Sequence, residues 1–398
     1  MFLDSIRIIA LLACLLIQPS SASVFVQCPG DTDGDAIIDT PDPQHPRAKC
    51  MHLSSGDGFV TMADGSEMYI LGFADVTGLT PEQALTDGLL AASFPAPTII
   101  LDEGDEFYLT LTNVGMALRP DLFDAHTVHW HGFPNAAPVF DGLPDSGIAI
   151  NMGASLTYYY HVVTPGTFMY HCHVEAAEHM QMGMLGNLYV RPAQNGSAFT
   201  YQGRTYTQFV YNDGDGSTGY DVEYAIQIGS FDPEFHAASE TVQPLPFAHM
   251  KDTYPMLNGR GYPDTVNPNA LPAPQANGGL VSQKQSALIT AKQGERVLLR
   301  LSNLNITRFY TLASLSLPMQ VVGKDAKLLR GPEGKNLFYE TQSVTLGGGE
   351  SVDVILDTQL ISPGRYFLYT TNLNYLSNDG EDFGGMMTEI IIEAGENA

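Results

Sequence analysis

The chain has 398 residues, which allows two domains of ordinary size. Its 44 Asp and Glu residues outnumber its 18 Lys and Arg residues, and the resulting net charge of −26 argues against nucleic acid as a partner. Only 16% of the residues are charged and 44% are hydrophobic, so the chain can bury a core, and its 39 glycines and 25 prolines favour turn-rich β-structure over a helical bundle.

The N-terminal residues have the pattern of an export signal. Arg7 precedes an apolar run over 8–17, and Ser21, Ala22 and Ser23 are small residues suited to cleavage. The pattern predicts a signal peptide over residues 1–23 and export to the periplasm or the extracellular space. A buried N-terminal helix and a lipoprotein site at Cys14 are less favoured alternatives. No other stretch is long and apolar enough for a membrane span.

Removal of the signal peptide would leave three of the four cysteines. Cys28 and Cys50 can pair in an oxidising compartment and staple the segment between them. Cys172 is then unpaired, and histidines flank it on both sides. A cysteine in this setting is a candidate metal ligand.

Residues 24–58 are expected to form a loop-like extension that contains an acidic twelve-residue segment. Five carboxylates and one carbonyl have the spacing of a calcium loop: Asp31, Asp33, Asp35, Ile37, Asp39 and Asp42. The segment departs from an EF-hand at Ala36 and at Asp42, and it resembles the calcium loops of thrombospondin type 3 repeats more closely. The alternative is a solvated acidic turn. If calcium binds here, its role is structural.

Short strands separated by Gly, Pro, Asn and Asp follow over residues 59–195 and again over 266–398. Examples are 97–101, 106–112, 156–163 and 186–190 in the first part, and 296–301, 351–356, 364–369 and 389–392 in the second. Residues 196–265 are less regular and are expected to be a linker region with one or two bridging strands. The pattern predicts an all-β chain with two copies of one β-sandwich type.

Two histidine clusters carry the chemistry. Cys172, His126 and His179 can supply a thiolate and two imidazoles, and Met184 can supply a weak axial thioether, with Met182 as its competitor. This is the ligand set of type 1 copper, an electron-transfer site. Zinc is the rival metal, but the paired Cys-x-x-Cys spacings typical of structural zinc are absent. The isolated histidines are expected to be satisfied polar side chains: His45, His52, His161, His236 and His249.

The motifs around these clusters resemble those of the multicopper oxidase and cupredoxin family. The resemblance rests on the sequence from Val128 to Phe133, on Asp141-Gly142 and on the segment from Pro165 to His173, and it extends over most of residues 59–398. It implies two cupredoxin-like Greek-key β-sandwich domains, the second without copper. It also implies that a second copper site is faced by four histidines: His129, His131, His171 and His173. The backbone from Cys172 to His171 and His173 would then connect the two sites.

The chain departs from the family in two respects. Type 1 copper is expected in the first domain, as in two-domain oxidases and copper nitrite reductases rather than three-domain laccases. No histidine follows His249, so a homotrimer, which the resemblance allows, cannot complete a trinuclear centre from this chain alone.

The sequence therefore leaves three functions open. The first is a copper oxidoreductase that takes electrons from a small-molecule reductant or a redox partner. The second is a non-enzymatic copper-binding protein or electron carrier. The third is an oxidase whose missing histidines come from a different chain. The acidic surface favours basic or cationic partners, although a solvated exported surface explains it equally well.

Overall fold

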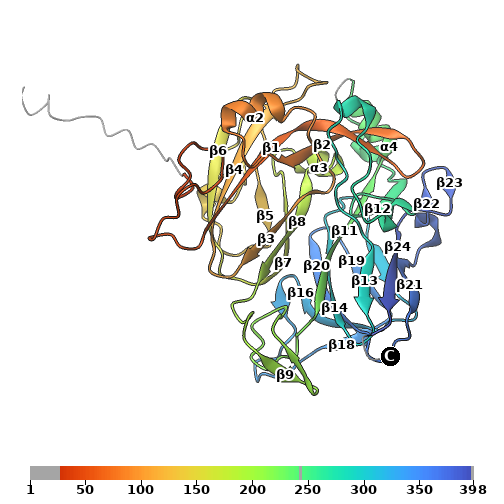
Figure 1. Cartoon of the computed structure of the whole chain (residues 1–398). Helices are drawn as coiled ribbons and strands as arrows, with labels where there is room; N and C mark the ends of the chain where they lie inside the picture. Colours follow the sequence, from red (N-terminus) through yellow and green to blue (C-terminus); the bar gives the residue numbers. More distant parts are fainter. Residues whose placement is uncertain (1–26, 242–243, 396–398) are drawn as a thin grey trace, which may run out of the picture.

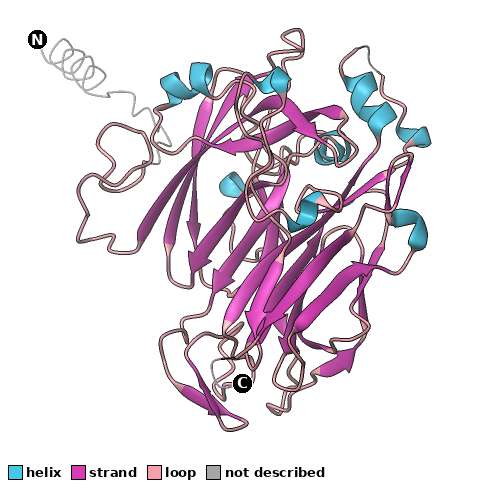
Figure 2. Ribbon diagram, turned by 45° about the vertical axis from the view of Figure 1, so that its right-hand side comes forward, coloured by secondary structure: helices cyan, strands magenta, loops and turns pink. Residues whose placement is uncertain are grey.

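The computed structural model describes residues 27–241 and 244–395, and the signal peptide expected over 1–23 lies outside them. Strands dominate the molecule, and the short helices lie at its periphery (Figure 2). Two β-sandwich halves follow one another along the chain (Figure 1), which confirms the expected all-β class. Among the described helices, none is long and apolar enough to cross a bilayer.

The first half consists of two four-stranded sheets. One sheet has the order β2 (Glu67–Asp75), β1 (Ala48–Thr61), β4 (Glu106–Gly115) and β6 (Ser155–His161). The other has the order β3 (Ala96–Asp102), β8 (Leu185–Arg191), β7 (Gly166–His171) and β5 (His129–His131). The β1–β4 and β3–β8 pairs are parallel, and the remaining pairs are antiparallel. Aromatic residues fill the space between the sheets, where Trp130 stacks on Tyr160 with ring centroids 3.8 Å apart.

The second half is a larger sandwich. Its seven-stranded sheet contains β12 (Tyr254–Leu257), β11 (Val222–Phe231), β14 (Arg296–Asn303), β20 (Glu350–Asp357), β16 (Met319–Lys324), β17 (Lys327–Leu328) and β18 (Tyr339–Thr341). Its five-stranded sheet has the order β13 (Ile289–Lys292), β24 (Met387–Glu393), β21 (Gly364–Thr370), β15 (Tyr310–Ala313) and β19 (Ser343–Leu346). Aliphatic residues from both sheets form its core.

Small elements complete the chain. Two short hairpins are formed by β9 (Phe199–Tyr201) with β10 (Arg204–Tyr206) and by β22 (Ser377–Asn378) with β23 (Glu381–Asp382). The helices are α2 (Pro81–Asp87), α3 (Ala176–Gln181) and α4 (Pro233–Ser239), and single 3₁₀ turns are η1 (Pro138–Phe140), η2 (Phe247–His249), η3 (Asp264–Val266), η4 (Gln275–Asn277) and η5 (Leu373–Tyr375). Asp232 caps α4, because its side chain accepts hydrogen bonds from the backbone N–H groups of Glu234 and Phe235.

One expectation about the boundaries was wrong. Residues 48–58 were expected to be loop, but they form most of β1, a central strand between β2 and β4. Their small polar side chains are buried there: Asp57 is 1% exposed, and its carboxylate accepts hydrogen bonds from the N–H groups of Ala117 and Leu118. The region over 196–265 contains strands, as expected, and two of them, β11 and β12, pair with each other and, through β11 and β14, with the second sandwich.

A buried polar network joins the two halves. Asp353 on β20 is 1% exposed and accepts hydrogen bonds from Thr167 on β7 at 2.5 Å and from the Tyr211 hydroxyl at 2.5 Å. Arg300 on β14 is fully buried and pairs with Glu223 at 2.9 Å and with Asp353 at 3.7 Å. The Thr167–Asp353 hydrogen bond thus links the start of β7 in the first sandwich to β20 in the second.

Candidate metal centre

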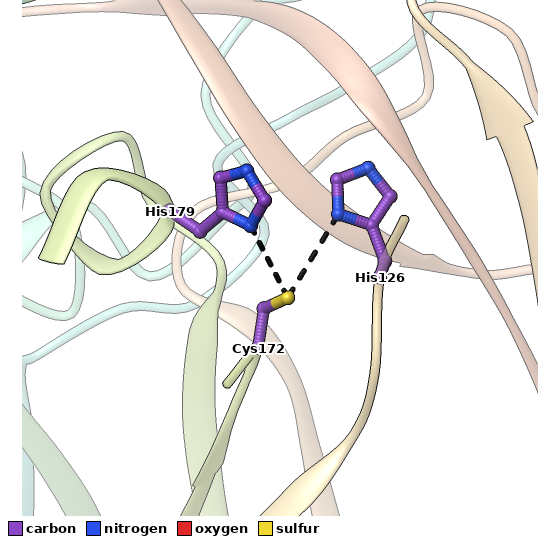
Figure 3. A group of neighbouring side chains, drawn as sticks. All are labelled: His126, Cys172 and His179. Carbon is purple, nitrogen blue, oxygen red and sulfur yellow. Dashed lines mark hydrogen bonds between the residues drawn. The ribbon is translucent and has the colours of Figure 1, made fainter. Parts of the chain in front are cut away.

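The first cluster brings three side chains together from different parts of the first half (Figure 3). Cys172 directly follows β7, His179 lies on α3, and His126 lies in the segment before β5. Cys172 Sγ is 3.2 Å from His179 Nδ1 and 3.8 Å from His126 Nδ1. The loop that carries these residues is closed by backbone hydrogen bonds from Cys172 N to Met184 O and from Met184 N to His179 O, at 3.1 and 2.8 Å.

All three side chains are fully buried. Burial raises the pKa of the Cys172 thiol to about 11 and lowers the pKa of His179 to about 4, while the pKa of His126 falls well below its usual range. The Nε2 atoms of both histidines have no hydrogen-bond partner among the described residues. The Nδ1 atoms of both histidines face Cys172 Sγ, and one sulfur with two imidazole nitrogens is a donor set that fits a soft metal ion such as copper.

The two competing thioethers differ in their surroundings. Met182 and Met184 are both fully buried in the same core cluster as Cys172. The Ser239 hydroxyl on α4 lies 3.3 Å from Met182 Sδ and 3.1 Å from Phe235 O, and its single proton can serve only one of them. The backbone of Met184 is hydrogen-bonded to both Cys172 and His179, which favours Met184 over Met182 as the fourth ligand.

The second cluster consists of four histidine rings. His129 on β5 lies opposite His171 on β7 in the sheet register, and their ring centroids are 5.3 Å apart. His131 Nδ1 is 3.3 Å from His171 Nε2. The ring of His173 lies 5.1 Å from that of His129 and 5.5 Å from that of His171. Ligand atoms of His129, His131 and His171 lie within 4.8 Å of one another, whereas His173 joins the cluster through its ring contacts only.

Backbone carbonyls orient two of these rings. His129 Nδ1 donates to Asp141 O at 2.6 Å, and His171 Nδ1 donates to Cys172 O at 2.8 Å. In each ring the Nε2 lone pair remains as the metal-binding atom, which is the usual arrangement of histidine ligands. Burial lowers the pKa of both histidines, that of His171 to about 3, so both imidazoles stay neutral and able to bind a metal ion.

A cavity of about 480 Å³ adjoins this second cluster. Residues 304–309 and Gly348 and Gly349, all from the second half, form its opposite wall. Gly349 approaches so closely that a Cβ atom there would lie 2.6 Å from His131 Nε2. No residue of this wall is a His, Cys, Asp or Glu, so within the described chain the second half contributes no metal ligand to the cavity.

The acidic segment gathers only part of its expected ligand set. Carboxylate oxygens of Asp31, Asp33 and Asp35 lie within 4.8 Å of one another. Asp39 Oδ2 instead accepts hydrogen bonds from Thr32 N and Oγ1 at 3.0 and 2.6 Å, and Asp42 accepts one from Gln44 N at 2.8 Å. The side chain of Ile37 is 48% exposed.

The Cys28–Cys50 disulfide is present, with Cα atoms 6.0 Å apart, and it ties this segment to β1. The pairing expected from the cysteine count is thus confirmed.

Two of the isolated histidines are satisfied polar side chains, as expected: His45 contacts Glu106 at 2.6 Å, and His52 lies between Leu79 O and the Thr112 hydroxyl. A third, His236, lies between Tyr69 O and Gln181 O, and a neutral ring can donate to only one of these carbonyls. Sequence reasoning missed the carbonyl of Asp141 and the arginine of the cavity wall, Arg308. Neither has a local signal, because both reach the cluster only through the packing of distant segments.

Comparisons with known proteins point to one family. A family model described as multicopper oxidase matches residues 82–195, and a second model with that description matches residues 235–397. The chain is 30% identical over 141 residues to multicopper oxidase MCE from Talaromyces pinophilus, covering 32% of this chain and 22% of that protein. It is 34% identical over 122 residues to Laccase-1 from Emericella nidulans, covering 30% of this chain and 18% of that protein. The chain thus spans about a fifth of the length of these curated relatives.

The fold has a close match among solved structures. The blue copper oxidase from Nitrosomonas europaea superposes with a TM-score of 0.61 over 86% of this chain and 85% of that chain, at 22% identity. At this identity the likeness concerns the fold, and it extends over both sandwich halves.

Proposed function

Because the chain belongs to the multicopper oxidase family, whose cofactor is copper, we propose that it is an exported copper oxidoreductase with two copper sites. The first site would take electrons from a reductant, and its ligands are His126, Cys172, His179 and Met184. The second site would receive them, and its ligands are His129, His131, His171 and His173. The observation that supports this most directly is the position of Cys172 between two histidines of the second cluster.

Copper supplies one-electron redox chemistry at such ligands. The chain supplies the surroundings. Complete burial excludes water from Cys172, His126 and His179, and the Thr127 N–H group 3.5 Å from Cys172 Sγ favours the thiolate that binds the metal. The peptide bonds from Cys172 to His171 and His173 make the shortest covalent connection between the two clusters.

A second candidate function is an electron carrier or copper-binding protein without catalysis. It is favoured by the cavity wall, because residues 304–309, Gly348 and Gly349 include no metal ligand. In this case the first site alone would hold a redox-active copper, and the four histidines would hold at most one further ion.

Three further features stay predictions, each with a direct test. Export by the signal peptide over 1–23 is tested by sequencing the N-terminus of the secreted protein. Structural calcium at the acidic segment is tested by metal analysis and by a higher thermal midpoint in calcium than in chelator. A homotrimer is tested by light-scattering mass measurement.

The decisive experiment measures copper content, the visible spectrum and the electron paramagnetic resonance (EPR) spectrum of the copper-loaded protein. Cys172→Ser removes the thiolate, so the blue band is expected to vanish while a non-blue copper signal survives. His129→Ala is expected to remove the non-blue signal and leave the blue band. His249→Ala changes an exposed histidine outside both clusters and is the control, so both the blue band and the non-blue signal are expected to remain.

The outcomes separate the two functions. Two or more coppers with these variant patterns, together with turnover of a reductant, support the oxidoreductase. A single blue copper, with no signal left in Cys172→Ser, would reject the second site and leave the electron carrier.

A further inference from the structure

Helix α3 contributes residues to the surroundings of both histidine clusters. His179 on this helix belongs to the first cluster, whereas Ala176 and Met180 line the cavity beside the second. Residues 304–309 form most of the opposite wall of that cavity. A helix of six residues is too short to be stable by itself, so the position of α3 is set by the contacts that it makes with its surroundings.

One buried carboxylate joins this helix to the opposite wall. Asp252, between η2 and β12, is 4% exposed. Its Oδ1 accepts a hydrogen bond at 3.3 Å from Nε2 of Gln181, the last residue of α3. Its Oδ2 accepts from Asn305 Nδ2 at 2.9 Å and from the Thr307 hydroxyl at 2.6 Å. The end of the helix and the wall segment therefore meet at one side chain.

The conformation of the wall segment depends on this carboxylate. While Nδ2 of Asn305 donates to Asp252, Oδ1 of Asn305 accepts from the backbone N–H groups of Thr307 and Arg308 at 2.9 and 2.7 Å. The Ser230 hydroxyl on β11 also donates to Asp252, so the described donors to this carboxylate are all uncharged side chains. An amide in place of the carboxylate would turn an N–H group toward some of these donors, and their buried hydrogen atoms would lose an acceptor.

We propose that Asp252 is a positioning residue shared by the two histidine clusters. Its carboxylate fixes the helix that carries His179 relative to the wall that faces the four histidines of the second cluster. The inference rests on the proposed copper sites for its effect on the metal signals, but the positioning itself is testable in the copper-free protein.

The copper-free test measures hydrogen–deuterium exchange of backbone amides in the whole chain. Asp252→Asn is expected to speed exchange by about tenfold or more both over residues 176–184 and over 304–309, because hydrogen bonds to a charged acceptor are lost on both sides. Gln181→Met cuts only the helix side and is expected to speed exchange over 176–184 alone. Thr307→Val cuts only the wall side and is expected to speed exchange over 304–309 alone.

The same variants are then compared in the copper-loaded protein. Asp252→Asn is expected to shift both the blue band and the non-blue EPR signal. Gln181→Met is expected to shift only the blue band, and Thr307→Val only the non-blue signal. A role in general stability would not separate the two signals in this way.

Asp213→Asn is the matched control. Asp213 is also 4% exposed, and its carboxylate also accepts hydrogen bonds only from uncharged groups, those of Gln194, Asp215, Gly216 and Thr218. None of these residues belongs to either cluster or lines the cavity. This variant is expected to lose stability while its copper signals and its exchange over 176–184 and 304–309 stay as in the wild-type.

Three results would overturn the inference: unchanged exchange of both segments in Asp252→Asn, faster exchange of only one of them, or the same acceleration in Asp213→Asn. If Asp252→Asn does not fold, the double variant Gln181→Met/Thr307→Val replaces it, since it cuts both connections and keeps the carboxylate. Absence of the non-blue copper would reject the proposed second site instead, and the copper-free exchange would still decide whether Asp252 positions the helix and the wall.

Discussion

Hydrogen bonds to backbone carbonyls fix the orientation of two histidine rings. The carbonyls of Asp141 and Cys172 accept hydrogen bonds from Nδ1 of His129 and His171. The shared face of histidines two residues apart could be predicted from the sequence, because side chains alternate along a strand. The contact of His129 with Asp141 could not, because it forms only when the loop between them folds back.

Single substitutions test whether Met184 or Met182 supplies the axial thioether. Met184→Leu removes the expected axial thioether and is expected to shift the blue band and raise the reduction potential, because the axial ligand tunes both. Met182→Leu is the matched change in the same core and is expected to leave the spectrum unchanged. The reverse pattern in visible spectra and redox titration would assign the axial position to Met182.

Burial of a histidine away from the metal clusters makes stability depend on pH. His52 is fully buried, with Nδ1 donating to Leu79 O and Nε2 accepting from the Thr112 hydroxyl, so the neutral ring is satisfied and burial lowers its pKa. In the unfolded chain its pKa is about 6.5. Below that pH the unfolded chain binds a proton that the folded chain refuses, so stability is present above about pH 6.5 and is lost as pH falls toward the folded pKa.

The expected contribution of His52 is a loss of up to about 1.4 kcal/mol per pH unit over that window. Denaturant unfolding at pH 7, 6 and 5 measures it. In His52→Gln the free energy of unfolding is expected to depend less steeply on pH than in the wild-type. In His249→Gln, at an exposed position, the dependence is expected to be unchanged. Identical slopes in His52→Gln and the wild-type would refute this account.

At the scale of elements, short strand-forming runs separated by Gly, Pro, Asn and Asp predicted several strands of both sandwiches, among them β3, β4, β14 and β20. Strand β1 is the exception, because its sequence of Ser, Gly and Asp is typical of loops. It is a strand because β2 and β4 flank it and because the segment after β4 covers it closely, with Asp57 receiving hydrogen bonds from that segment. Such burial depends on residues 60 positions away and leaves no local pattern.

The close contact between β1 and the end of β4 gives a stability prediction. A Cβ atom on Gly56 would lie 2.8 Å from both Gly115 O and Val114 Cγ2, so Gly56→Ala is expected to destabilise the fold by about 1–3 kcal/mol. Gly380→Ala is the control, because a Cβ there has nothing within 4 Å. Urea unfolding compares the two, and equal stabilities would mean that β1 is not closely covered.

At the scale of the whole molecule, the packing of the second half over the histidines could not be predicted from the sequence. Buried charges on three strands of the second sandwich, Glu223, Arg300 and Asp353, pair with one another, and Asp353 and Arg300 reach the first half through the Thr167 hydroxyl on β7. Residues this far apart in sequence give no signal of their contact until both sandwiches are formed.

Removing one member of this network tests its role. Asp353→Ala leaves Arg300 buried with fewer partners and frees Thr167 and Tyr211, so a loss of about 3–5 kcal/mol is expected in denaturant unfolding. Asp357→Ala, at the exposed end of the same strand, is expected to cost less than about 0.5 kcal/mol. Equal effects would show that the network does not hold the halves together.

The two sandwiches contribute different surfaces to the cavity. Every histidine beside it comes from residues 129–173, whereas the opposite wall comes from 304–309 and 348–349. The histidine-bearing half and the wall-bearing half can therefore vary in sequence separately. A library of variants confined to the wall segments would reshape the cavity while leaving all four histidines unchanged.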